Sequence, residues 1–147
     1  KGGGFLMHLL QVTDYKLEAS DQPVVKALYQ NLNRKELVSS AGATPTPGDL
    51  VFFHNTYDRD GDGRADDWFT QAGVVERVDG NGTVYFISYS RGQIRRLVLN
   101  TAHPARQTNS ADGQNLNSFM REKTLTDRPF TAYLAGELFA AYGKLKE

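Results

Sequence analysis

The sequence of 147 residues contains no cysteine. This absence excludes disulfide bonds, metal sites built on thiolates and catalysis by a thiol nucleophile. An excess of charge is also lacking, because seventeen basic residues balance seventeen acidic ones. The chain therefore has no overall field that would draw nucleic acid, and we expect no nucleic-acid partner.

Long hydrophobic runs are missing as well. The longest apolar stretch, Phe5 to Leu10, is interrupted by His8 and falls short of the roughly 20 residues that cross a bilayer. We therefore expect no membrane span. The chain begins with Lys1 rather than methionine, so residues 1–4 suggest a linker, a processing site or a cloning remnant.

The residues that are present have the composition of an ordinary folded domain, with 39% hydrophobic and 23% charged residues. This length supports one hydrophobic core, so we predict a single domain over residues 1–147.

Apolar periodicity predicts two helices with a sheet between them. The first helix covers residues 22–33, entered through Pro23 and capped by Ser20 or Asp21. The second covers residues 130–142, where apolar side chains fall on one helical face. Four strands are predicted in an antiparallel meander, over residues 50–54, 72–78, 83–90 and 94–99. This order of elements predicts an α+β fold.

The most distinctive motif is an acidic turn between the first two predicted strands. Aspartates stand at the first, third, fifth and ninth positions of an EF-hand-like loop, glycine stands at the sixth, and the seventh residue offers its carbonyl. These residues are Asp58, Asp60, Asp62, Asp66, Gly63 and Arg64. Alternate carboxylates in a tight turn converge on a hard cation, so the motif predicts a structural calcium site.

The motif leaves two alternatives for this loop. Phe69 replaces the bidentate glutamate of position 12, so either Asp67 substitutes for it or the coordination stays incomplete. Asp and Gly are also favoured in turns for backbone reasons, so a bare solvated turn is the alternative to a cation site. Repulsion between the crowded carboxylates, about 1 kcal/mol per close pair in water, favours the bound cation.

A family resemblance is carried by three segments: PGDLVFF at 47–53, GVVE at 73–76 and GTVYFI at 82–87. They resemble the core of NlpC-type and CHAP (cysteine, histidine-dependent amidohydrolase/peptidase) domains, which are papain-like peptidoglycan hydrolases. The resemblance implies a papain-like α+β fold, with an antiparallel sheet of about four or more strands packed against N-terminal and C-terminal helices. It also implies an extracytoplasmic location, in the cell envelope or secreted.

The catalytic residues of that family are missing from the matching positions. The resemblance places the nucleophilic cysteine at Asp21, the histidine at Gln71 and the polar orienting residue at Ser88. Glutamine cannot accept a proton at neutral pH, and loss of a triad member costs about 10⁴-fold in rate. The resemblance therefore implies a pseudoenzyme with three vacated positions.

Three other residues are candidates for lining a groove: Ser20 near the nucleophile position, His54 at a strand end and Trp68 beside the acidic turn. His54 and Trp68 have packing roles as their alternatives, whereas an exposed indole could stack on a sugar or a partner. We expect an inactive envelope module that binds peptidoglycan, a peptide or an envelope protein. The alternative is an active peptidoglycan amidase or endopeptidase with an atypical nucleophile such as Ser20.

Overall fold

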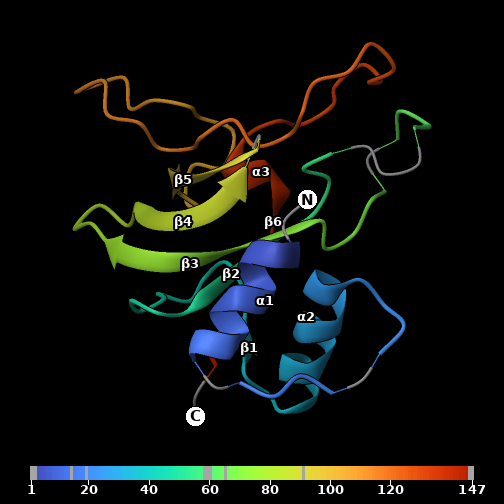
Figure 1. The fold of residues 1–147 in the computed structure, drawn as a ribbon. Coiled ribbons are helices and arrows are strands. Elements are labelled where there is room, and N and C mark those ends of the chain that lie inside the picture. The colour runs from blue at the N-terminus through green and yellow to red at the C-terminus, as the bar shows by residue number, and fades with distance from the viewer. Residues whose placement is uncertain are drawn as a thin grey trace.

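One antiparallel sheet organises the structure, a computed structural model that describes residues 3–13, 15–18, 20–57, 61–64, 66–90 and 92–145. The strands in these ranges are β1 Val38–Ser39, β2 Leu50–Phe53, β3 Gln71–Val78, β4 Val84–Ser90, β5 Gln93–Leu99 and β6 Phe139–Gly143. The helices in the same ranges are α1 Gly3–Val12, α2 Val24–Arg34 and α3 Ala135–Leu138. The six strands lie in the order β1-β6-β2-β3-β4-β5 (Figure 1). The predicted α+β class is thus confirmed.

The predicted meander is confirmed, since β2, β3, β4 and β5 pair in sequence, each antiparallel to the last. Side chains alternate between the two faces of the sheet. Leu50 and Phe52 pack under α1 and α2, whereas Val51 and Phe53 join a second cluster on the opposite face. That second face is covered by α3 and by the long connection that follows β5 (Figure 1).

Helix α2 confirms the predicted helix over 22–33, but the predicted cap is wrong. Pro23 precedes the helix, and no side chain caps its first turn. Instead, the hydroxyl of Ser20 accepts a hydrogen bond from the backbone N–H of Gln22. This short turn uses the serine oxygen locally, so it is not available to the helix amides.

Helix α1 was not predicted. Leu6 and Leu10, four residues apart, fall on one helical face and are buried in the cluster beneath α2. None of the helices in the described ranges has both the length and the apolarity needed to cross a membrane.

The predicted C-terminal helix over 130–142 is wrong. Its helical part is the single turn α3, after which the chain extends as β6 between β1 and β2. There β6 pairs with a strand on each side, which satisfies its backbone groups on both edges. A short apolar run such as Phe139 to Tyr142 fits a buried strand as well as a helix, and pairing decides between them. Phe130, the first apolar residue of the predicted helical face, is fully exposed.

Candidate functional site

Two of the positions that the resemblance assigns to catalytic residues lie side by side. Gln71 opens β3, and Ser88 sits on β4 opposite Gly73, so both side chains fall on the sheet face away from α2. Gln71 Nε2 donates to Ser88 Oγ at 2.8 Å and to the carbonyl of Tyr89 at 3.2 Å. Ser88 Oγ in turn donates to the carbonyl of Ala72 at 2.8 Å. The pair is buried and satisfied, and it contains no group that titrates near neutral pH.

The third position that the resemblance assigns, Asp21, does not join this pair. Asp21 is exposed in the segment before α2, where its carboxylate accepts a hydrogen bond from Gln22 Nε2 at 3.3 Å. Helix α2 packs on the face that carries Phe52, whereas Gln71 projects from the other face with Phe53. Among the described residues, no hydrogen bond joins Asp21 to Gln71 or Ser88.

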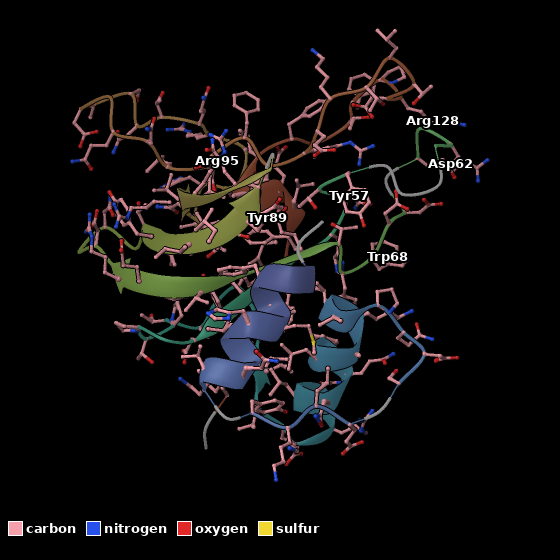
Figure 2. The ribbon with its side chains drawn as sticks, viewed as in Figure 1. Tyr57, Asp62, Trp68, Tyr89, Arg95 and Arg128 are labelled. Atoms are coloured by element: carbon pink, nitrogen blue, oxygen red, sulfur yellow. The ribbon has the colours of Figure 1, made fainter. Side chains whose placement is uncertain are left out.

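The groove candidates His54 and Trp68 are brought together. Their rings meet edge to face with centroids 4.9 Å apart, and the His54 ring also contacts Phe69 at 4.5 Å. His54 Nδ1 accepts a hydrogen bond from the backbone N–H of Phe69 at 2.8 Å. Burial lowers the pKa of His54. The imidazole is thus a neutral packing group whose Nδ1 is occupied, while Trp68 remains 52% exposed beside it (Figure 2).

Phe69 belongs to an aromatic wall rather than to a cation site. Its ring stacks on Tyr29 of α2 with centroids 4.1 Å apart and meets the edge of Phe52 at 6.4 Å. The residue adopts a positive φ of 52°, which turns the chain from the acidic loop back into the sheet. Trp68, His54 and Phe69 form the aromatic surface at the base of the loop, with Trp68 largely exposed and Phe52 fully buried beneath it.

Paired hydrogen bonds close the acidic loop at its base. Asn55 and Asp67 exchange two of them, because the Asn55 N–H donates to the Asp67 carbonyl and the Asp67 N–H donates to Asn55 Oδ1, both at 2.7 Å. Next to them, the hydroxyls of Thr56 and Thr70 lie 2.7 Å apart and are buried. These contacts hold the two ends of the loop together.

The structure describes only some of the predicted cation ligands. Asp58 and Asp60 lie outside the described residues. Asp62 and Asp66 are exposed, and Asp62 Oδ1 accepts a hydrogen bond from the Arg64 N–H at 2.8 Å. Asp67, in contrast, is only 6% exposed at the closed base.

Gly63 has the positive φ, 75°, that a sharp turn requires. In the described ranges, no three His, Cys, Asp or Glu side chains are grouped closely enough to hold a metal ion. The calcium site thus stays a prediction from the motif.

A buried ion pair, which the sequence analysis did not predict, links the base of the acidic loop to the segment 121–133. Arg121 Nη2 contacts Asp127 Oδ1 at 2.9 Å, and the two side chains are 0% and 5% exposed. Arg121 Nη1 also donates to the carbonyl of Asn55 at 2.9 Å, and Tyr133 donates its hydroxyl proton to Asp127 Oδ2 at 2.7 Å. The closed base of the acidic loop is therefore anchored to residues 121–133.

This network fixes the charge of its members. Burial raises the pKa of Asp127, but hydrogen bonds from Arg121, Tyr133 and Thr124 outweigh burial and hold that pKa well below its usual range. The hydrogen bond to Asp127 raises the pKa of Tyr133. No sequence motif predicts the network of Arg121, Asp127 and Tyr133, because these residues lie in an irregular polar stretch without periodicity.

Comparisons with known proteins do not assign the chain to a family. No family model matches it, and no curated protein or solved structure shows a significant match. The resemblance to NlpC-type and CHAP domains therefore remains a prediction that rests on the three sequence segments.

Proposed function

We propose that this chain is a catalytically inactive CHAP/NlpC-like binding module of the bacterial cell envelope, located outside the cytoplasm. The buried pair of Gln71 and Ser88 is the observation that supports the proposal best. It occupies the positions where the resemblance places a histidine and its orienting partner. Neither side chain can shuttle a proton at neutral pH, and the chain has no thiol to activate.

The aromatic surface at the base of the acidic loop supports a binding role. Trp68 is 52% exposed, and its ring meets the ring of His54, which in turn contacts Phe69. Such a surface suits a sugar ring or an apolar side chain, since an indole combines a large flat face with an N–H donor. The ligand class is accordingly a cell-wall fragment, a peptide or an envelope protein.

Binding to purified sacculi tests this proposal. Trp68 is the only tryptophan, so its fluorescence reports directly on the surface. We expect the protein to sediment with sacculi and Trp68→Ala to lose most of this binding. Phe119→Ala is the matched control, because Phe119 is 49% exposed elsewhere.

The same experiment can contradict the proposal in two ways. Absence of binding both to sacculi and to isolated envelope proteins would remove the binding role. Mass analysis of the incubated muropeptides checks the alternative. Cleavage that disappears on mutation of Ser20, His54 or Ser88 would instead establish an active hydrolase.

Calcium bound in the loop from Asp58 to Asp67 is the second part of the proposal. Support comes from the spacing of the aspartates, the positive φ of Gly63 and the closed base formed by Asn55 and Asp67. A cation there would relieve repulsion between carboxylates and stiffen the loop beside Trp68. Its role would be structural.

Thermal unfolding with calcium and with chelator tests the cation site. At one hundred times Kd, a ligand adds about 2.7 kcal/mol, which should raise Tm by roughly 5 °C or more. Asp60→Asn should abolish this increase, whereas Asp112→Asn, an exposed aspartate in another loop, should retain it. An identical Tm in calcium and chelator would exclude the site.

A further inference from the structure

The outer edge of β5 offers backbone groups that the described fold leaves open. In an antiparallel pair, hydrogen-bonded and non-bonded residue pairs alternate along the ladder. Ser90 and Gln93 are paired across a connection of two residues, which makes them a hydrogen-bonded pair. Counting from them along β5, Ile94, Arg96 and Val98 direct their N–H and C=O groups away from β4.

Contacts at Val98 confirm which residues of β5 direct their backbone groups away from β4. Val98 N–H donates to Ser118 Oγ at 2.9 Å, and the Ser118 N–H donates to the Val98 carbonyl at 3.0 Å. The segment around Ser118 therefore covers the edge at Val98. No hydrogen bond within the described residues reaches the outward groups of Ile94 or Arg96. The backbone N–H and C=O groups of Ile94 and Arg96 therefore provide two donors and two acceptors. They alternate along the edge, as pairing with an added extended chain requires.

The side chains at this edge specify what kind of chain would fit. Ile94 is 62% exposed and lies across from Tyr89 on one face of the sheet. Arg96 is neutralised by Glu76, whose two oxygens accept from its guanidinium at 2.8 Å each. Arg95, on the other face, donates Nε to the carbonyl of Ser90, and no carboxylate contacts it in the described part of the chain (Figure 2). The edge therefore presents one apolar side chain and one unneutralised cation.

We propose that β5 takes up an extended acidic peptide as an added strand at Ile94 to Arg96, a binding site separate from the aromatic surface around Trp68. Peptide residues opposite Ile94 and Arg96 exchange backbone hydrogen bonds with them. The residue between these two lies opposite Arg95, with its side chain on the same face. The matching motif is apolar, acidic, apolar, with the carboxylate beside Arg95 and an apolar side chain beside Ile94.

A second copy of the chain fits this edge less well. The antiparallel register that pairs Ile94 and Arg96 of both copies places the two Arg95 side chains directly opposite each other. Like charges in that position destabilise the pair. A foreign acidic segment replaces this repulsion with attraction.

Titration of the ¹⁵N-labelled full chain with the acetylated, amidated peptide Ser-Val-Glu-Val-Ser tests the proposal. We expect saturable shifts of the Ile94 and Arg96 amides and slower hydrogen exchange at both. Methylating the backbone nitrogens of the two valines keeps the side chains and removes the donors, so binding should disappear. A peptide with lysine in place of glutamate should bind about tenfold more weakly, since attraction becomes repulsion.

Charge reversal on the protein separates a binding role of Arg95 from a structural one. Arg95→Glu should weaken binding of the glutamate peptide and strengthen binding of the lysine peptide, which a misfolded variant could not do. Unchanged Ile94 and Arg96 amides at millimolar peptide would overturn the proposal, as would equal binding of the methylated peptide. Protection of these amides that grows with protein concentration alone would show self-association and also overturn it.

Discussion

His54 shows most directly how the structure determines the state of a single residue. Its Nδ1 accepts the Phe69 N–H, and burial lowers its pKa. Protonation would place a second N–H against the amide that now donates to it, so the folded protein favours the neutral ring with its proton on Nε2. Of the two roles that the sequence allowed for this histidine, packing at the strand end is the one that the geometry supports.

The free energy of unfolding should therefore fall as the pH is lowered through the range of a free histidine. Between the depressed pKa of folded His54 and the unfolded value of 6.5, the unfolded chain binds more protons, so stability rises with pH there. Below both values this contribution is lost. His54→Asn keeps an acceptor for the Phe69 N–H but does not titrate.

Urea unfolding of both proteins between pH 7.5 and pH 5 measures the effect. The advantage of the wild type over His54→Asn should shrink as the pH falls. His8 and His103 are common to both proteins and cancel in the difference. Parallel curves would show that His54 does not couple its protonation to folding.

At the scale of elements, the acidic loop packs against a neighbouring loop at Gly63. Gly63 is buried, and a Cβ atom placed on it would collide with the carbonyl oxygen of Thr126. Figure 2 shows Asp62 and Arg128 on the two neighbouring loops that meet here. The glycine of the predicted cation motif therefore serves a packing contact as well as a turn.

A pair of glycine substitutions separates these two roles. Gly61 and Gly63 have nearly equal positive φ values, 73° and 75°, but a Cβ atom placed on Gly61 would meet no atom of the described residues within 4 Å. Gly61→Ala should cost about 1 kcal/mol from backbone strain alone. Gly63→Ala should cost roughly 1–3 kcal/mol more, because the loops must separate. Equal losses in urea unfolding would show that the contact with Thr126 contributes nothing.

The four strands of the meander could be predicted from sequence because turn residues bound each apolar run. At the C-terminal end the same reasoning fails, since the residues from Phe139 to Gly143 are apolar or small without a diagnostic period. Their strand conformation depends on partners far away in sequence, such as Val38 and Leu50. Local pattern contains no information about such partners.

At the scale of the whole molecule, the ion pair of Arg121 and Asp127 joins the loop base to the far connection. Asp127→Asn keeps the shape but leaves a buried guanidinium without its counter-charge, which should cost about 3 kcal/mol or more. Glu18→Gln is the matched control, because Glu18 pairs with Arg34 at side-chain exposures of 66% and 59%. There we expect less than about 1 kcal/mol.

Chemical unfolding of the two variants provides the comparison. A loss at Asp127→Asn no larger than that at Glu18→Gln would mean that water reaches Arg121 in solution. Trp68 fluorescence and far-UV circular dichroism should report the same transition for each protein, because the loop base and the sheet are linked through Arg121.

Only part of the candidate site could be predicted from the sequence. The adjacency of Gln71 and Ser88 depends on the register between β3 and β4, and a bulge near Val75 shifts that register. Asp21 was aligned with them by analogy, yet it is exposed in the segment before α2, where it contacts Gln22. Arg121 and Asp127 were missed because a buried ion pair in an irregular segment leaves no periodic signal.

The position of β6 bears on how the chain reaches its native state. β6 is the second strand from one edge of the sheet, between β1 and β2, and there Gly143 pairs with both Val38 and Leu50. Closing so long a stretch of chain is entropically costly, and such nonlocal pairing slows folding. Until β6 docks, the fully buried strand β2 has an open edge of apolar residues. During synthesis, the edge of β2 would thus stay unpaired and prone to aggregation until residues 139–143 have been synthesised. Early binding of a chaperone would therefore be advantageous for this fold.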